Sequence, residues 1–223
     1  MKVLFCGYRD WSLDVYRKLK DYFKVSDLFE VFHVANTPQQ LTALTKSTKY
    51  DVIIVVGWSW KVDENTLKNS YVVGMHPSDL PSYAGGSPIQ NQIIDGLKSS
   101  HASLFKLTPK FDEGPVLAKE QFNLDGHMDD IFLELTRVSF KMLANFLARF
   151  PCVTELAQVN QEAPKKRLKP EQSKLDKSQV VDFTCSKLYD LIRCREDPYP
   201  NVYLEDETGK LFFKRVEFVK ANR

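Results

Sequence analysis

Short apolar runs alternate with amphipathic stretches along the first half of the chain. Four runs have the length and composition of buried strands: residues 3–5, 29–34, 52–56 and 71–73. Two stretches between these runs carry apolar positions at helical spacing, at residues 12–22 and 38–45. Thr37 directly before Pro38 is a typical helix start. The alternation predicts an α/β fold with a mainly parallel sheet flanked by helices.

The pattern changes in the second half. A helix is expected at residues 88–96, and two strands at residues 102–107 and 116–122 flank a turn at Asp112. A long helix follows at residues 129–149, with one apolar stripe formed by Ile131, Leu135, Val138, Met142 and Phe146. We expect this helix to be part of the scaffold.

A second region begins near residue 150. Residues 158–177 are polar, contain Pro and Lys, and have no clear period, which predicts a traversing segment. A short helix at residues 186–195 and a hairpin with strands at 202–205 and 211–213 follow. We therefore divide the chain into a core, residues 1–150, and a linker with a small C-terminal helix and β-hairpin subdomain, residues 151–223. The apolar hairpin offers an edge to a second copy, so a homodimer is compatible with the sequence.

Composition excludes several classes of protein. The 223 residues are 43% hydrophobic and 27% charged, as in ordinary globular proteins. A net charge of +2 does not support a large nucleic-acid interface, although an anionic small molecule is compatible. No run approaches the ~18 apolar residues of a membrane span, and the N-terminal apolar run is too short for a signal peptide, so we expect a cytoplasmic protein without a membrane partner.

Neither metal nor nicotinamide chemistry is indicated. The four cysteines, Cys6, Cys152, Cys185 and Cys194, have no Cys-x-x-Cys spacing, which favours buried free thiols over a metal site or disulfides. Gly7 follows the first strand without a Gly-x-Gly-x-x-Gly fingerprint. The run at residues 165–167, Lys-Lys-Arg, is typical of a solvated surface stretch.

Candidate chemistry lies in two loops. His76 follows a predicted strand and opens a loop rich in Pro and Gly, at a position where open α/β sheets collect ligands. Asp112 lies where the chain reverses in Phe-Asp-Glu-Gly-Pro. Taken alone, His76 is equally compatible with a half-exposed structural histidine. For Asp112 alone, a cap or Asx-turn residue is the favoured interpretation.

Together the two loops resemble a known family. The sequence His-Pro-Ser-x-Leu-Pro-x-Tyr-x-Gly-Gly-x-Pro-Ile-Gln from His76, followed by Phe-Asp-x-Gly-Pro from Phe111, resembles the catalytic domain of N10-formyltetrahydrofolate-dependent formyltransferases. The resemblance extends from the first strand to about residue 147. The loop and residues 165–173 are most similar to the enzymes that formylate amino sugars carried on nucleotides. It implies a Rossmann-like core and an enzyme of one-carbon transfer.

The resemblance also implies roles. Formyl transfer needs a partner for a developing oxyanion and a base for the attacking amine. His76 would assist the formyl oxygen or the departing folate nitrogen, and Asp112 would keep His76 correctly charged and relay the amine proton. The implied donor is N10-formyltetrahydrofolate, without a metal. The implied acceptor is the primary amine of a nucleotide-linked dideoxyamino sugar such as a dTDP sugar, in surface-glycan or lipopolysaccharide O-antigen synthesis.

Two sets of binding residues follow. A folate slot is expected at Trp58, Leu80, Pro81, Tyr83, Leu107, Thr108 and Pro109. The nucleotide sugar is expected to contact Tyr8, Arg9, Gly85, Gly86, Ser87, Gln90, Asn91 and Lys106. Ordinary packing is an alternative for Trp58 and for Trp60.

The chain departs from the family at one position. Gly74 stands where the family has an Asn two residues before the His, whose amide helps to hold the formyl oxygen. Another donor must replace it, such as a loop N–H, Asn91 or a water, or the activity is altered. Asp79 in the loop also adds a carboxylate of unknown purpose.

Three alternatives therefore stay open. One is a methionyl-tRNA formyltransferase, disfavoured by the short region after residue 150 and the balanced charge. Another is a glycinamide ribonucleotide formyltransferase, disfavoured by the added C-terminal segment and the loop sequence. The third is a catalytically silent folate or nucleotide binder. The sequence leaves the nucleobase, the sugar, the modified amine and the oligomeric state open.

Overall fold

A six-stranded sheet forms the centre of the computed structural model, which describes residues 1–159 and 163–221. The strand order is β2-β1-β3-β4-β5-β6. The parallel strands are β1 (Lys2–Cys6), β2 (Val31–Ala35), β3 (Val52–Val56) and β4 (Tyr71–His76). The antiparallel strands are β5 (Ser99–Lys106) and β6 (Val116–Asn123). The predicted α/β fold with a mainly parallel sheet is confirmed.

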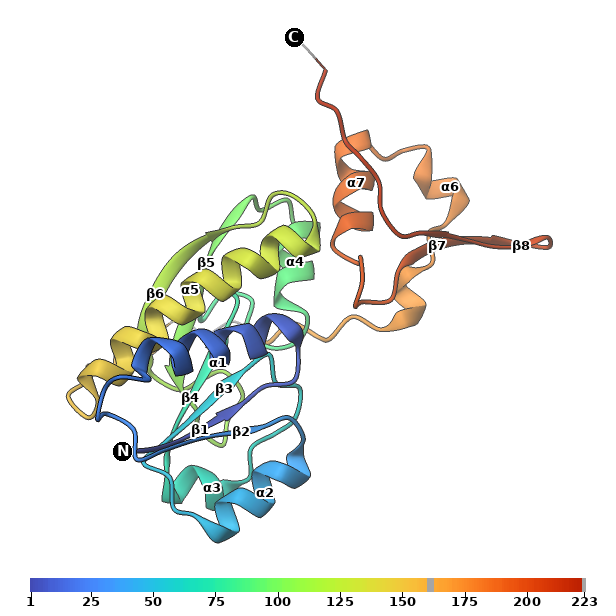
Figure 1. Cartoon of the computed structure of the whole chain (residues 1–223). Helices are drawn as coiled ribbons and strands as arrows, with labels where there is room; N and C mark the ends of the chain where they lie inside the picture. The colour runs from blue at the N-terminus through green and yellow to red at the C-terminus, as the bar shows by residue number, and fades with distance from the viewer. Residues whose placement is uncertain (160–162, 222–223) are drawn as a thin grey trace.

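Helices cover both faces of this sheet (Figure 1). Helices α1 (Asp10–Phe23) and α5 (Met128–Arg149) pack on one face, and α2 (Pro38–Ser47) and α3 (Glu64–Asn69) on the other. Successive strand residues point to opposite faces, so Val3 joins the α1 and α5 cluster while Leu4 joins the α2 cluster. The predicted N-cap is confirmed, because the Thr37 side chain accepts a hydrogen bond from the Gln40 amide.

Strand alternation places His76 on the α2 and α3 face. Val72 belongs to the cluster on that face, and Val73 belongs to the cluster on the opposite face. Gly74 and His76 therefore share the face of Val72. In the antiparallel register with β5, Gly74 lies opposite Phe105 and His76 lies opposite Ser103.

The C-terminal region is smaller than the core and contains its own hairpin. It comprises the 3-10 helix η1 (Pro170–Ser173), helices α6 (Lys177–Val180) and α7 (Cys185–Arg193), and strands β7 (Val202–Asp206) and β8 (Gly209–Phe213). The hairpin projects away from the rest of the molecule (Figure 1). The predicted helix and hairpin are confirmed. Cys194 and Tyr199 nevertheless pack into the core cluster of α1 and α5, so the boundary near residue 150 remains a proposal.

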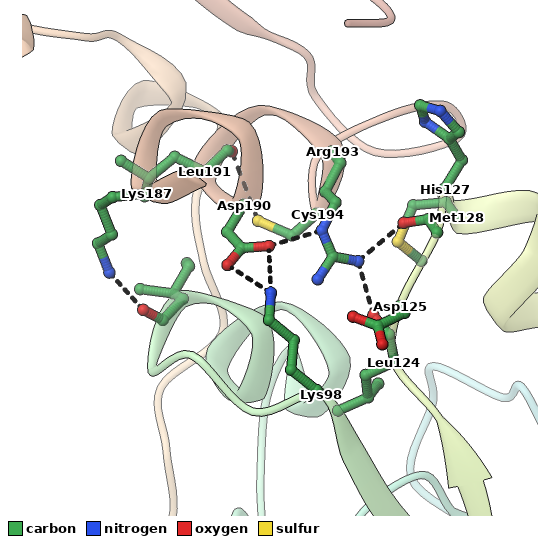
Figure 2. Close-up of polar contacts among 12 residues, drawn as sticks. Lys98, Leu124, Asp125, His127, Met128, Lys187, Asp190, Leu191, Arg193 and Cys194 are labelled. Carbon is green, nitrogen blue, oxygen red and sulfur yellow. Dashed lines mark hydrogen bonds and ion pairs between the residues drawn. The ribbon is translucent and has the colours of Figure 1, made fainter. Parts of the chain in front are cut away.

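Charged side chains join this region to the core. Asp190 of α7 accepts bonds from Lys98 Nζ at 3.0 and 3.2 Å and from Arg193 Nε at 2.7 Å (Figure 2). Arg193 Nη1 donates to the carbonyls of Leu124 at 2.6 Å and Gly126 at 2.8 Å. The Arg193 residue is only 1% exposed. We call Lys98, Asp190 and Arg193 the anchor cluster; it holds α7 beside α4 (Pro88–Ile94).

The cysteines follow the prediction only in part. All four are free, as expected, but Cys152 and Cys185 are exposed while Cys6 and Cys194 are buried. The expectation of burial is wrong for the two exposed thiols, because both lie beyond the apolar core elements. Within the described residues, no group of three or more His, Cys, Asp or Glu side chains could hold a metal ion. None of the described helices is long and apolar enough to span a membrane.

Candidate active site

His76 lies at the end of β4 and is only 7% exposed. Its Nε2 atom is 3.0 Å from the Tyr83 carbonyl oxygen. Because a carbonyl oxygen only accepts, Nε2 carries the hydrogen in this contact. The other ring nitrogen, Nδ1, faces Asp112 Oδ2 at 3.6 Å. The ring is thus oriented by one nitrogen and presents the other to the carboxylate.

Asp112 reaches His76 from the loop between β5 and β6. Its backbone adopts φ +54°, the left-handed region that is uncommon for residues other than Gly. Its Oδ2 atom also accepts a hydrogen bond of 2.8 Å from the Gly85 amide. The structure therefore brings together the two side chains proposed for catalysis, although their catalytic role stays a prediction.

Internal hydrogen bonds hold the loop after β4. The buried Ser103 hydroxyl donates to the Ser78 carbonyl at 2.7 Å and accepts from the Leu80 amide at 3.1 Å. The side-chain amide of Gln92 donates to the Pro77 carbonyl at 2.8 Å. These bonds come from β5 and α4, so two regular elements fix the loop that follows His76.

The carboxylate of Asp79 now has a structural explanation. It pairs with Lys119 of β6, and its Oδ2 lies 3.6 Å from His101 Nδ1 on β5. Lys119 Nζ also donates to the Leu80 carbonyl at 2.6 Å. Asp79 thus ties the loop to β5 and β6.

The position of the family's Asn is filled by apolar atoms. A Cβ atom on Gly74 would lie 2.4 Å from Leu107 Cδ1 and 3.0 Å from Phe105 Cε1. Carbon atoms that close would not offer partners to a bridging water, which needs polar neighbours. The missing amide is therefore not replaced by a polar group at that spot.

The N–H groups that could replace the family's Asn amide already donate hydrogen bonds within the protein. The Asn91 side-chain amide donates to the Gly86 carbonyl at 2.9 Å. The Gly85 amide donates to Asp112, and the Gly86 amide donates to the Lys165 carbonyl at 2.8 Å. Each of these N–H groups would have to break a bond to serve the formyl oxygen, whereas His76 Nδ1 faces Asp112 Oδ2 at 3.6 Å, beyond hydrogen-bond distance.

Residues 165–168 explain the Gly-Gly pair. A Cβ atom on Gly86 would lie 2.4 Å from Arg167 Cα. The Lys165 amide donates to the Ala84 carbonyl at 2.7 Å, and the Leu168 amide donates to Ser87 Oγ at 3.0 Å. The glycines thus admit another backbone segment, and the side chains of Lys165, Lys166 and Arg167 are exposed, as expected for a solvated stretch. Contacts of Gly85, Gly86 and Ser87 with a nucleotide sugar would have to replace these bonds.

Some of the residues expected at the folate slot pack together, and others lie in the adjoining loops. Leu80 packs with Phe105, and Leu107 contacts both this cluster and the one that includes Trp58. Trp58 Nε1 is buried and has no hydrogen-bond partner among the described residues. The Tyr83 hydroxyl instead donates to Asp95 at 3.0 Å. Pro81, Thr108 and Pro109 lie in the adjoining loops.

A cationic and aromatic cluster, formed by Tyr8, Arg9, Gln90 and Tyr199, lies beyond the carboxyl end of β1. The Arg9 guanidinium is 5.0 Å from the Tyr8 ring centre and 5.7 Å from that of Tyr199. Gln90 is 3% exposed, and its Nε2 atom has no hydrogen-bond partner among the described residues. Burial raises the pKa of Tyr199, while the Gln90 side chain and the charges of Arg9 and Arg167 oppose this rise.

Tyr199 was missed by the sequence-based prediction because it lies far along the chain, in the Asp-Pro-Tyr-Pro turn. Lys106 does not join this cluster. It lies opposite Val73 in the register of β4 and β5, and its Nζ is 2.9 Å from Glu155 Oε1 and 4.7 Å from the ring centre of Tyr71, the first residue of β4. Because β1 and β4 run parallel, the amino end of β4 lies at the opposite side of the sheet from the carboxyl end of β1, which Arg9 follows. The structure therefore gives Lys106 another partner than the one predicted.

The family assignment rests on a match to the sequence profile of the formyl transferase family. It covers residues 18–136, just over half of the chain, and includes both His76 and Asp112. The chain belongs to the formyl transferase family. It is 24% identical over 189 residues to the methionyl-tRNA formyltransferase of Rickettsia massiliae (strain Mtu5), which covers 71% of this chain. The chain spans 63% of the length of that relative.

Solved structures share the fold over nearly the whole chain. A methionyl-tRNA formyltransferase from Clostridium thermocellum has a TM-score of 0.88 and 26% identity, covering 98% of this chain and 94% of its own. A sugar N-formyltransferase from Shewanella sp. FDAARGOS_354 has a TM-score of 0.75 and 15% identity, covering 99% of each chain. The predicted Rossmann-like formyltransferase fold is therefore confirmed.

Proposed function

We propose that this chain transfers a formyl group from N10-formyltetrahydrofolate to the primary amine of a nucleotide-linked dideoxyamino sugar, in surface-glycan synthesis. The observation that carries the proposal is the His76 imidazole facing the Asp112 carboxylate at 3.6 Å inside the matched family region. An imidazole and a carboxylate supply both groups that acyl transfer to an amine requires.

The two side chains share the proton transfers. Bound N10-formyltetrahydrofolate would supply the electrophilic formyl carbon. Protonated His76 stabilises the negative charge that develops on the formyl oxygen, and gives its proton to the departing nitrogen. Asp112 accepts the proton that the amine loses as its nitrogen bonds to the formyl carbon, and relays it to His76, so both side chains return to their starting states. Each contribution is typically on the order of a hundredfold or more.

The apolar residues near His76 fit a folate. Trp58, Leu80 and Leu107 belong to contiguous clusters on the His76 face of the sheet. The buried Trp58 Nε1–H has no hydrogen-bond partner among the described residues. A ring heteroatom of the bound folate would accept its hydrogen bond. Ligand pockets combine such apolar walls with a few polar groups.

The cluster around Arg9 fits an anionic acceptor. The Gln90 side chain and the guanidinium groups of Arg9 and Arg167 all oppose the rise in the pKa of Tyr199, so donors and positive charge gather at this hydroxyl. Arginine recognises phosphate oxygens through paired N–H donors. These features support a diphosphate as the part of the acceptor that this cluster binds.

Three further parts of the proposal concern the whole protein. We propose a homodimer through the hairpin, where Leu211 and Phe212 are exposed. We retain the division of the chain near residue 150. The exposed free thiols of Cys152 and Cys185 support a reducing compartment such as the cytoplasm.

Methionyl-tRNA is the second candidate acceptor. It is favoured by the names of the Rickettsia and Clostridium relatives and by the high TM-score of the latter. The net charge of +2 provides little of the basic surface that tRNA binding uses. The two candidates share the donor and the His76 and Asp112 chemistry, and differ in the acceptor.

An acceptor panel distinguishes them. Purified protein with N10-formyltetrahydrofolate would be tested against dTDP-, GDP- and UDP-linked amino sugars, methionyl-tRNA and glycinamide ribonucleotide, with tetrahydrofolate release followed spectrophotometrically. We expect release with a nucleotide sugar, and none from the H76A variant. Release with methionyl-tRNA alone would replace the proposed acceptor. Folate and nucleotide binding without release across the panel would support the silent homologue.

A further inference from the structure

The segment that follows the core contacts both loops of the candidate active site. Leu156 and Val116 exchange backbone hydrogen bonds of 2.8 and 2.9 Å, directly after the Asp112 turn. Further along, Lys165 pairs with Ala84 and Gly86 in the loop that follows His76. A segment expected only to traverse the surface is thus bonded to both loops.

Gln158 makes the most specific of these contacts. Its side-chain Nε2 donates two hydrogen bonds of 2.7 Å, one to the carbonyl of Asp112 and one to the carbonyl of Gly114. The two carbonyls lie on either side of Glu113, so a single amide group clamps the turn that carries the carboxylate. The Oε1 atom of Gln158 is buried without a partner among the described residues, which is a cost that the donated bonds offset.

The Asp112 turn needs such a clamp. Asp112 has a backbone φ of +54°, and a left-handed residue other than Gly persists only where its surroundings hold it. The neighbouring Phe111 is 67% exposed, so apolar burial does little to fix the turn. On its other side Gly114 lies against the Lys106 carbonyl, which a Cβ atom would approach to 1.8 Å.

We propose that Gln158 is a positioning residue for formyl transfer. By holding the two carbonyls of the turn, it keeps Asp112 Oδ2 on the Gly85 amide at 2.8 Å and at 3.6 Å from His76 Nδ1. Misplacing a reacting group by about 1 Å can cost about 100-fold in rate. This inference rests on the proposed function, and it adds that residues beyond the core set the geometry of the catalytic carboxylate.

The kinetic test uses the full chain with the acceptor that the panel identifies. Gln158→Met has a similar length and no donors, and Gln158→Glu places a carboxylate against two carbonyl oxygens. We expect kcat to fall between about 10-fold and 100-fold in both variants, with KM for donor and acceptor changed by less than about twofold. The matched control is Gln39→Met, at an exposed position on α2, with unchanged kcat. A wild-type kcat in Gln158→Met would overturn the proposal.

A second measurement does not depend on activity. The Gly85 amide donates to Asp112 Oδ2, so its hydrogen exchange reports whether the carboxylate is held in place. We expect NMR to show at least about tenfold faster exchange at Gly85 in Gln158→Met, with unchanged exchange at Leu107, whose amide donates to the Val72 carbonyl. Unchanged exchange at Gly85 would overturn the positioning role. Failure of the wild type to formylate any acceptor would overturn the proposed function instead.

Discussion

Two charge clusters in this molecule are bonded in different ways. In the anchor cluster, Asp190 is bonded directly to Arg193 at 2.7 Å and to Lys98 at 3.0 Å. In the candidate active site, His76 and Asp112 lie 3.6 Å apart and each is bonded to a backbone group instead. The charged groups of the anchor cluster bond one another as well as backbone carbonyls, whereas each member of the candidate catalytic pair bonds a backbone group and not its partner.

This difference explains what each cluster can do. A buried ion pair whose members bond each other is costly to break, because the remaining charge is left without a partner. Side chains that are positioned by backbone groups and do not bond each other can turn to a reacting group without breaking an ion pair. We therefore expect substitutions in the anchor cluster to change stability, and substitutions in the catalytic pair to change rate.

The largest expected effect is on catalysis. His76→Ala and Asp112→Asn should each lower kcat by on the order of 100-fold to 10,000-fold, because each removes an acid–base or charge-stabilising group. Circular dichroism and the thermal midpoint should show that both variants remain folded. A near-normal rate in either folded variant would remove that residue from the proposed mechanism.

The next largest effect is on stability. Asp190→Ala should lower the free energy of unfolding by about 3–5 kcal/mol, because Arg193 is left as a buried charge. Urea denaturation measures this loss. The control is Asp14→Ala, which removes an exposed ion pair with Arg17 and should cost at most about 1 kcal/mol.

Thiol labelling would show where Asp190→Ala loosens the molecule. Burial raises the pKa of Cys194, next to the anchor cluster, to about 11 and that of Cys6, in the sheet, to about 12. Both thiols should resist alkylation at pH 8 in the wild type. In Asp190→Ala, Cys194 should be labelled faster than Cys6. Equal acceleration at both would mean that the cluster stabilises the whole fold and not the docking of α7.

The sequence predicts the layers of this fold better than its long-range contacts. Buried runs such as residues 52–56 and the apolar stripe of α5 have periods that define strands and helices locally. The short helix α3 was missed, because six residues carry too little periodicity. The anchor cluster was also missed: Asp190 and Arg193 look like ordinary polar positions of a helix until Lys98 is placed beside them.

The site shows the same limit. No spacing rule brings His76 and Asp112 together; their pairing was expected only because two motifs resemble one family. Gln158 lies 46 positions from Asp112 in a segment without a period. Its role follows from where its amide points, which depends on the whole fold. Contacts of this kind carry no local sequence signal.

The apolar wall at Gly74 gives a smaller expected effect. Gly74→Asn should destabilise the protein by about 1–3 kcal/mol, because the new Cβ would lie 2.4 Å from Leu107 Cδ1. Adding Leu107→Ala frees that space, so the double variant should be more stable than the sum of the single losses predicts. Additive losses in urea denaturation would show that Leu107 is not what excludes the family's Asn.

The smallest expected effect on stability comes from Asp63, a carboxylate that bonds groups of its own helix turn. Asp63 caps α3: its Oδ1 accepts from the Thr66 amide at 2.9 Å and its Oδ2 from the Thr66 hydroxyl at 2.7 Å. Asp63→Ala should cost about 1 kcal/mol at pH 7, without a change in kcat.

The Thr66 hydroxyl and amide hold the pKa of Asp63 below its usual range, against the opposing effect of burial. The charge-dependent part of this stability is therefore fully present above about pH 4 and is lost as the pH falls through the lowered pKa. Denaturation of wild type and Asp63→Ala should show a difference that shrinks in acid, and a difference that grows there would contradict the capping role.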